Sequence, residues 1–191
     1  NFFQQRGKKM NYQEKTVTLK DGTVCRICSP QKKDAGQILE HMRITSEETH
    51  HMLRYPDEIM RTREEEEQYL EESLNSETDL LIAAFIGEEL VGNAGISCVG
   101  TCKKVRHRAV FGVSVKKKYW GRGIGWILLD AITEEARGMG YDQLELDVFS
   151  DNKSARALYR KAGFEEWGRI PNAFRLKNGS RYDAILMGKV L

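Results

Sequence analysis

Apolar and polar positions along this chain follow two spacings, one typical of strands and one typical of amphipathic helices. Residues 109–115 form a run rich in β-branched side chains, as expected of a strand. Apolar side chains then recur at the spacing of one helix face, at Ile124, Leu128, Ala131 and Ile132. A basic stretch and three alternate glycines separate the two, at Gly121, Gly123 and Gly125. The centre of the chain therefore predicts a strand, a glycine-rich turn and a helix.

The remaining elements follow from the same two spacings and from turn residues between them. Alternating or continuous apolar runs, separated by Asp-Gly and Asn-Gly pairs, predict strands at 16–19, 23–28, 79–86, 89–97, 144–148, 167–176 and 182–190. The first two of these form either a small hairpin or one bent strand. Helical spacing predicts further helices at 34–42, 64–74 and 152–163. A polar loop is expected after the first helix, and Ser150 or Asp151 is expected to cap the last one.

Composition limits the class of protein. A chain of 191 residues, 40% hydrophobic and 30% charged, is ordinary for one globular domain. Residues 1–9 are polar and aperiodic and are expected to be a tag or a disordered arm, which leaves 10–191 as a single domain. The net charge of +2 argues against a nucleic-acid partner, and no apolar run is long enough to span a membrane. A cytoplasmic location is therefore expected.

The cysteines raise the question of a metal site, because Cys25 and Cys28 have the spacing of a zinc-binding pair. Both residues fall in a predicted strand, however, where side chains three apart point to opposite faces. The sequence therefore predicts thiols and no metal.

The glycine-rich turn and the helix at 152–163 carry the candidate chemistry. Glycines allow successive backbone N–H groups to converge, and the following helix adds the positive end of its dipole, so this turn is suited to bind phosphate. On the later helix, Asn152 and Tyr159 fall on one side, at positions i and i+7, so an amide and a phenol share a face.

Two motifs carry a resemblance to a known family. The strand end Val113-Ser114-Val115 with the turn Trp120-Gly121-Arg122-Gly123-Ile124-Gly125, and the later segment Asn152 to Phe164, are similar to the two central motifs of the GCN5-related N-acetyltransferases (GNAT). The resemblance covers about residues 16–191. Members of the family usually have Gln or Arg at the position of Trp120. The resemblance implies an α/β (α+β) fold with a mixed, mostly antiparallel central sheet of about seven strands, flanked by helices and splayed at the cofactor site.

The resemblance also implies a cosubstrate, acetyl-coenzyme A, and roles for individual residues. Its pyrophosphate is expected on the turn, at Gly121, Arg122, Gly123, Ile124 and Gly125. The main chain of Val113 and Val115 is expected to pair with the pantetheine arm, and Val113 N–H to polarise the thioester carbonyl. Asn152 would bind the arm, and Tyr159 would act as the general acid on the sulfur. The lysines at 116–118 either bind or steer the cofactor, or they form a solvent-exposed segment at the end of the strand.

The base that deprotonates the acceptor is less specified, because the family uses different residues for it. Candidates are His107 at the entry to the central strand, Glu47 or Glu48, and Glu145 or Asp147. His107 is preferred because its strand runs toward the thioester site. The histidines at 41, 50 and 51 lack a comparable context.

The predicted function is acetyl transfer to a primary amine of a small molecule or a protein N-terminus, by direct attack. The segments 169–172 and 182–187 resemble the branch that acetylates protein N-termini, but the acceptor and the oligomeric state, a homodimer included, stay open. Two other classes remain as alternatives. One is a catalytically silent acyl-coenzyme A-binding module. The other is a nucleic-acid binder using the basic residues of 103–108 and 116–118, which the near-neutral total charge disfavours.

Overall fold

The computed structural model describes residues 11–191, so the predicted tag or arm at residues 1–9 lies outside the described residues. Eight strands form one sheet in the order β1-β2-β3-β4-β5-β6-β8-β7. They are β1 (Lys15–Thr18), β2 (Val24–Cys28), β3 (Leu80–Ile86), β4 (Glu89–Cys98), β5 (Arg108–Val115), β6 (Gln143–Phe149), β7 (Glu165–Arg175) and β8 (Arg181–Val190). The helices are α1 (Ala35–Glu48), α2 (Arg63–Asn75), α3 (Ile124–Gly138) and α4 (Lys153–Lys161), with short 3-10 turns η1 (Lys32–Asp34), η2 (Pro56–Glu58) and η3 (Lys117–Tyr119).

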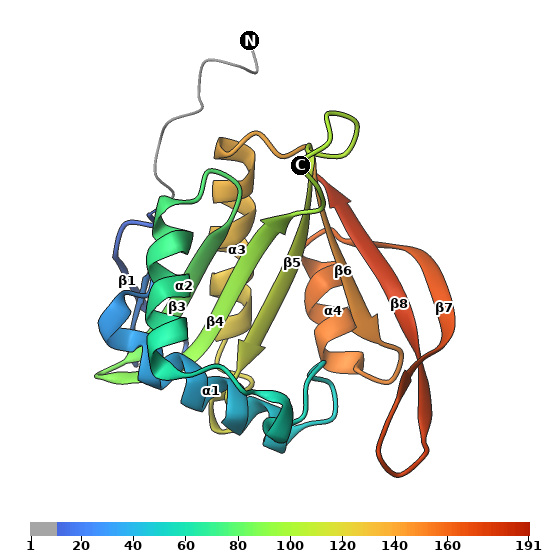
Figure 1. Cartoon of the computed structure of the whole chain (residues 1–191), viewed down its shortest axis with the longest axis horizontal. Helices are drawn as coiled ribbons and strands as arrows, with labels where there is room; N and C mark the ends of the chain where they lie inside the picture. Colours follow the sequence, from blue (N-terminus) through green and yellow to red (C-terminus); the bar gives the residue numbers. More distant parts are fainter. Residues whose placement is uncertain (1–10) are drawn as a thin grey trace.

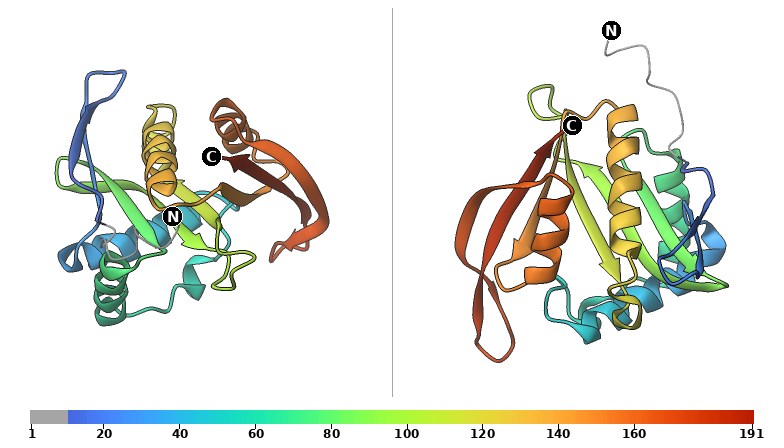
Figure 2. Two further views of the ribbon diagram at one scale, coloured as in Figure 1. Left: turned by 90° about the horizontal axis from the view of Figure 1, so that it is seen from above. Right: turned by 180° about the vertical axis from the view of Figure 1, so that it is seen from behind.

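The predicted fold class is confirmed. Every neighbouring pair of strands is antiparallel except β5 and β6, which are parallel. The strand count is eight rather than about seven, because the first two runs pair with each other as a hairpin. Helices α3 and α4 cover one face of the sheet, and α1 and α2 cover the other (Figures 1 and 2).

The strands β5 and β6 diverge after a short shared segment, as Figure 1 shows. Their pairing is confined to Arg108–Val110 against Gln143–Glu145. On its other side, β5 pairs with β4 along its whole length, from Ala109 to Val115. From Phe111 onward, β5 therefore has one edge that no other strand within residues 11–191 pairs with. We call residues 111–115 on that side the open edge.

The core lies mainly between the sheet and α3. The four side chains that α3 was predicted to direct inward pack in one cluster with residues of β4, β5 and β6. Ile124, Leu128 and Ile132 are at most 1% exposed, and Ala131 is 8% exposed. Burying three such side chains contributes about 1.5–3 kcal/mol each. The rigid packing of α3 fixes the position of the turn that precedes it.

Two predictions about helix ends were wrong. The helix α1 does not stop at Met42 but continues to Glu48, and within this extension Thr45 is only 2% exposed and its hydroxyl donates to the carbonyl of His41 at 2.8 Å. Tertiary packing thus extends the helix through a polar segment that has little apolar periodicity. Helix α4 is capped by Asn152, whose Oδ1 accepts from the N–H of Ala155 at 3.2 Å, rather than by Ser150 or Asp151.

The cysteines follow the strand geometry expected of β2. Cys25 packs in the core cluster that contains α3, and Cys28 packs against the cluster beneath α1, so their side chains lie on opposite faces of the sheet. Both thiols are free. Burial raises the pKa of each thiol, which keeps it protonated at neutral pH.

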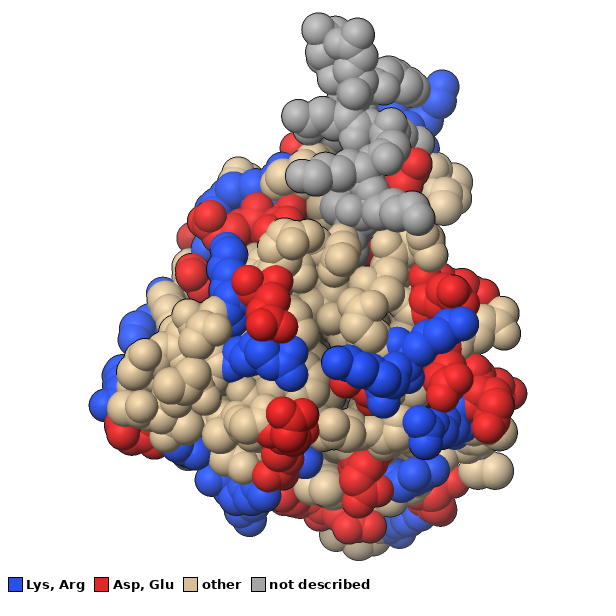
Figure 3. Space-filling view, turned by 90° about the vertical axis from the view of Figure 1, so that its left-hand side faces the viewer, with Lys and Arg blue, Asp and Glu red and all other residues tan. Residues whose placement is uncertain are grey.

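The surface carries both signs of charge. On the face shown in Figure 3, lysine and arginine side chains alternate with aspartate and glutamate rather than gathering by sign. Among the helices within residues 11–191, none combines the length and the apolar character that crossing a membrane requires.

Candidate active site

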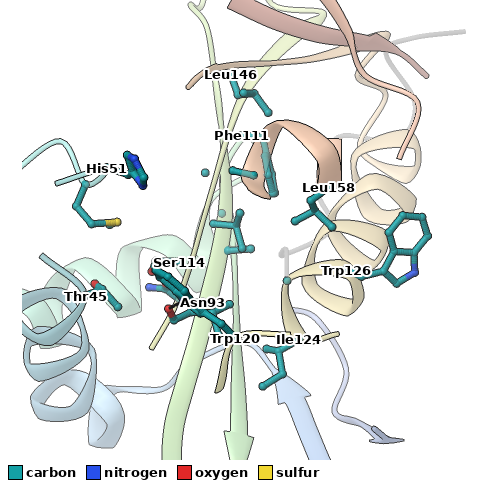
Figure 4. Close-up of a pocket in the computed structure, with 18 of the residues that line it drawn as sticks. Thr45, His51, Asn93, Phe111, Ser114, Trp120, Ile124, Trp126, Leu146 and Leu158 are labelled. Atoms are coloured by element: carbon teal, nitrogen blue, oxygen red, sulfur yellow. Dashed lines mark hydrogen bonds between the residues drawn. The ribbon is translucent and has the colours of Figure 1, made fainter. Parts of the chain in front are cut away.

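A cavity of about 1240 Å³ runs along the open edge and reaches both helical layers. All nine residues predicted to bind the cofactor line it: Val113, Val115, Gly121, Arg122, Gly123, Ile124, Gly125, Asn152 and Tyr159. Figure 4 shows Ile124, Trp126 and Leu158 on one side of this space and Thr45 and His51 on the other. Residues from the sheet, from helices on both of its faces and from the loops between them therefore meet in one site.

The hydrogen-bond register of β5 determines which backbone groups face this cavity. The N–H of Lys116 donates to the carbonyl of Val91 at 2.9 Å, and the N–H of Val99 donates to the carbonyl of Arg108 at 3.0 Å. In an antiparallel pair, residues that bond to the partner alternate along the strand, so the even-numbered residues of β5 bond to β4. The main-chain groups of Val113 and Val115 consequently point to the open edge.

The carbonyl of Val115 already has a hydrogen-bond partner, the side chain of Trp120. The indole N–H of Trp120 donates to the carbonyl of Val115 at 2.7 Å, and the Trp120 side chain is 48% exposed. Trp120 therefore folds back from the turn onto the end of β5. This contact explains a residue that departs from the family pattern, and it leaves the N–H groups of Val113 and Val115 directed to the cavity.

The turn between β5 and α3 depends on glycine. Gly121 has φ 76° and Gly123 has φ 90°, both in the left-handed region that L side chains avoid. Gly123 is also the N-cap residue of α3, so the free N–H groups of the first helical turn and the positive end of the dipole face the same point. The turn is therefore suited to hold an anion through its backbone.

The side chain of Arg122 is directed elsewhere. Its Nε donates to Asp21 Oδ2 at 2.7 Å, and its guanidinium also bonds Thr23. Arg122 thus ties the β1–β2 turn to the glycine turn. Its backbone lines the cavity, while its charge is shared with an aspartate.

The three lysines that precede the turn lie outside the cavity lining. Lys116 is only 7% exposed, and both Lys116 and Lys118 donate to Glu89 at 2.9 Å. These hydrogen bonds, that of Lys118 first, lower the pKa of Glu89 to about 2. Lys117 contributes its N–H, which Glu48 Oε2 accepts at 2.6 Å. The lysine cluster therefore acts mainly as a structural anchor for η3.

Tyr159 sits on α4 with its ring buried to 7% exposure, edge-on to Phe111 at 6.2 Å between ring centroids. Its hydroxyl has no hydrogen-bond partner among residues 11–191. Burial raises the pKa of Tyr159 to about 12, so the phenol keeps its proton at neutral pH. The hydroxyl is therefore a permanent donor with no competing protein partner.

The structure does not bring the preferred base to this site. His107 precedes β5 at the end where β5 pairs with β6, and it is not among the residues that line the cavity. Six residues of extended strand separate it from Val113, which corresponds to about 20 Å. The strand β5 does lead from His107 toward the part of the cavity lined by Val113 and Val115, but His107 stands at its far end.

The four carboxylates considered as the base differ in whether they line the cavity and whether another group already bonds to them. Glu145 makes two hydrogen bonds to Arg108, which lower its pKa below the usual range, and Glu47 is exposed outside the cavity lining. Glu48 lines the cavity but already accepts from Lys117. Asp147 also lines it, from an exposed position on β6.

A buried polar network lies beneath the cavity floor on the α1 side. Ser114 Oγ donates to Asn93 Oδ1 at 2.7 Å, and with its hydrogen so directed it accepts from His41 Nε2 at 2.8 Å. His41 is 0% exposed, and its Nδ1 has no partner among the described residues. Burial first, and the charge of Lys116 second, lower the pKa of His41 to about 4. The imidazole is therefore neutral at pH 7.

A second histidine cluster was not anticipated from the sequence. His50 and His51 follow α1, and Asp151 precedes α4, so 100 residues separate the parts that meet here. His50 Nε2 lies 2.8 Å from Asp151 Oδ2, and His51 Nε2 lies 3.3 Å from Asp151 Oδ1. These are donor types that metals use, with ligand atoms within 4.8 Å of one another. The adjacent pair of histidines was the available signal, but their distant aspartate could not be identified from spacing.

The chain is similar in sequence to curated N-acetyltransferases. It is 37% identical over 101 residues to the N-alpha-acetyltransferase RimI of Mycobacterium tuberculosis, which is 53% of this chain and 61% of that protein. It is 33% identical over 110 residues to the L-amino acid N-acetyltransferase AaaT of Escherichia coli, which is 57% of this chain and 67% of that one. The match thus spans less than two thirds of the length of RimI.

A solved structure agrees over most of the chain. The acetyltransferase of the GNAT family from Streptococcus pneumoniae superimposes with a TM-score of 0.84 and 30% sequence identity, covering 87% of this chain and 99% of that one. The model of the acetyltransferase (GNAT) family matches residues 42–164, which contain the open edge, the glycine turn and Tyr159. Both motifs lie on one cavity, and the family model matches more than half of this chain. The chain therefore belongs to the acetyltransferase (GNAT) family.

Proposed function

We propose that this protein transfers an acetyl group from acetyl-coenzyme A to a primary amine. The observation that carries the proposal is the juxtaposition in one cavity of the open edge of β5, the glycine turn at the start of α3 and the unpartnered hydroxyl of Tyr159. Each of these supplies one requirement of acyl transfer from a large anionic thioester. Family membership supports the same reaction class.

The glycine turn would bind the pyrophosphate through backbone N–H groups, because the Arg122 guanidinium is held by Asp21. The N–H groups of Val113 and Val115 would pair with the pantetheine arm as an added strand does. The N–H of Val113 would then polarise the thioester carbonyl, where negative charge develops during attack. Asn152 uses its Oδ1 to cap α4, so its Nδ2 is the group able to donate to the arm.

Tyr159 would donate a hydrogen bond to the sulfur as the C–S bond breaks. A phenol with a pKa of about 12 is a weaker acid than a thiol, whose ordinary pKa is about 8.5. Full proton transfer to the thiolate is therefore unfavourable at equilibrium, and the main contribution of Tyr159 is to stabilise developing charge on the sulfur.

The acceptor is proposed to be a primary α-amine, on a protein N-terminus or a free amino acid. The names of the two relatives, an N-alpha-acetyltransferase and an L-amino acid N-acetyltransferase, describe acceptors that share this group. The cytoplasmic location expected from the sequence stays a prediction. A homodimer also stays one of the predicted oligomeric states.

An acceptor panel tests the proposal. The protein is incubated with acetyl-coenzyme A and with N-terminal peptides, free amino acids or polyamines, and thiol release is followed together with the mass of the product. We expect release and a 42 Da mass gain with at least one primary amine, and none with the same peptide already acetylated. Tight binding of acetyl-coenzyme A without release for any amine would instead support the catalytically silent module.

A glycine substitution separates binding by the turn from general stability. Gly123→Ala forces a side chain into a φ of 90°, although the added Cβ would meet no atom within 4 Å, so the effect is conformational strain alone. We expect a loss of about 1–2 kcal/mol in the free energy of unfolding and a rise of about tenfold in the KM for acetyl-coenzyme A, because the N–H groups shift.

Gly87→Ala is the matched control for this substitution. Gly87 has φ 58° in the β3–β4 turn, and there too an added Cβ would meet no atom within 4 Å. Urea unfolding should show a similar loss of stability, while the KM for acetyl-coenzyme A should be that of the unsubstituted protein. Equal KM values for the two variants would contradict phosphate binding by the glycine turn.

A further inference from the structure

The second histidine cluster lies at the end of the cavity opposite the glycine turn. Thr49 and His51 line the cavity, whereas Asp151 and His50 are not among its lining residues. His51 faces the cavity from the loop after α1, as Figure 4 shows, across from Phe111 and Leu146. The cluster therefore borders the space that the acceptor would enter.

A continuous series of contacts leads from the cavity to the surface. Thr49 Oγ1 lies 3.0 Å from His51 Nδ1, and His51 Nε2 lies 3.3 Å from one oxygen of Asp151. The other oxygen of Asp151 accepts from His50 Nε2 at 2.8 Å. Hydroxyl, imidazole and carboxylate follow one another in the order that activates a hydroxyl for proton transfer in unrelated enzymes.

We propose that His51 is the base that removes the proton from the acceptor amine, acting through the Thr49 hydroxyl, with Asp151 as its positioning residue. The proposal rests on the proposed function and supplies the base that His107 is too distant to provide.

The local electrostatics suit this role. Burial, and next the charge of His50, lower the pKa of His51, so its resting form is neutral and can accept a proton. Asp151 acts in the opposite direction, because its carboxylate stabilises the imidazolium that forms. The titratable groups around His51 are His50 from the same loop, Asp151 from the β6–α4 loop and Tyr182 of β8. The Tyr182 ring stacks on His50, with 5.0 Å between the ring centroids. For Nδ1 to accept a proton, the neutral imidazole of His51 carries its hydrogen on Nε2. This Nε2 lies 3.3 Å from Asp151 Oδ1 and has no hydrogen-bond partner among the described residues, so no other group competes with the carboxylate for it.

The proton balance of the reaction is complete with these groups. The acceptor enters as an ammonium ion and gives one proton to the Thr49 oxygen as the Thr49 hydroxyl proton moves to His51 Nδ1. The neutral amine then forms the C–N bond, and the C–S bond breaks. The nitrogen loses its second proton, the departing thiolate gains one proton, and His51 returns one proton to solvent. No oxidant or metal ion is required.

His51→Gln tests the assignment, with His107→Gln as the matched control. We expect kcat/KM for the amine to fall about 100-fold or more in His51→Gln, with the KM for acetyl-coenzyme A unchanged, and the control to stay within twofold of the unsubstituted protein. Unchanged thermal unfolding in both variants establishes that they are folded. Added imidazole should partly restore turnover to His51→Ala.

Asp151→Asn tests whether Asp151 acts on His51 through its charge. A merely structural role of Asp151 would leave the shape of the kcat/KM–pH profile unchanged. Removing the carboxylate lowers the pKa of His51 further, so the acidic limb of the kcat/KM–pH profile should shift to lower pH while the maximum falls. Two results would overturn the proposal: turnover and pH profile of His51→Gln equal to those of the unsubstituted protein, or loss of activity in EDTA that Zn²⁺ restores, which would assign the cluster to a metal. Absence of transfer by the unsubstituted protein to any amine would instead overturn the proposed function.

Discussion

Tyr159→Phe is expected to lower kcat by about 100-fold while leaving the affinity for acetyl-coenzyme A nearly unchanged. The substitution removes one hydroxyl and keeps the ring, whose edge-on contact with Phe111 fills the gap beneath α4. Because that hydroxyl has no partner within residues 11–191, its loss leaves no buried group unsatisfied and should change the free energy of unfolding by less than about 0.5 kcal/mol. The effect should therefore fall on the chemical step.

Single-turnover kinetics with acetyl-coenzyme A and the best amine of the panel would measure this step. Tyr141→Phe is the matched control, since Tyr141 is equally buried but donates its hydroxyl to the carbonyl of Thr78, outside the cavity lining. That control should lose about 1 kcal/mol of stability and keep its kcat. A Tyr159→Phe variant with unchanged single-turnover rate would exclude a role for the phenol at the sulfur.

The free energy of unfolding is expected to fall by about 3 kcal/mol between pH 6.5 and pH 4 because of His41 alone. Burial lowers the pKa of His41 to about 4, whereas an unfolded histidine titrates near 6.5. Between these values the unfolded chain binds a proton that the folded chain does not, so acid favours unfolding. The stabilising contribution is complete above pH 6.5 and is lost as the pH falls toward 4.

Urea unfolding of the unsubstituted protein and of His41→Gln at pH 7 and pH 4.5 would isolate this contribution. Glutamine keeps a donor for Ser114 and does not titrate, so the variant should lose less stability over this interval than the unsubstituted protein. Glu89, whose hydrogen bonds to Lys118 and Lys116 lower its pKa to about 2, is present in both proteins, so its contribution cancels in the comparison. Identical losses for the two proteins would show that His41 is not the responsible group.

Much of the cavity lining around the glycine turn could be predicted because it is local in sequence. The glycines at 121 and 123 fix the turn through their own φ angles, and the strand before them and the helix after them are continuous with it. The alternation of Val113 and Val115 along one strand then sets their common direction. Short-range geometry of this kind depends on a few neighbouring residues, which the sequence displays directly.

The predictions that failed depended on contacts between distant segments. The length of α1 was underestimated because Thr45, a polar residue outside the apolar periodicity, is buried in the fold. Nothing in the sequence indicates that the indole of Trp120 returns to Val115. His107 precedes β5, as the sequence indicated, but the length of that strand separates it from Val113 and it lies outside the cavity lining.

The sequence by itself therefore determined the fold class, the family resemblance and the cofactor-side motifs, because each is written in residues close together along the chain. Only the tertiary structure decided which side chains reach the acceptor end. There, the loop after α1 places Thr49 within hydrogen-bonding distance of His51, and it places His51 within ion-pair distance of Asp151, about one hundred residues away. Such proximity arises because the rings of His50 and His51 pack on Phe149 at the end of β6, two residues before Asp151, and no local spacing encodes it.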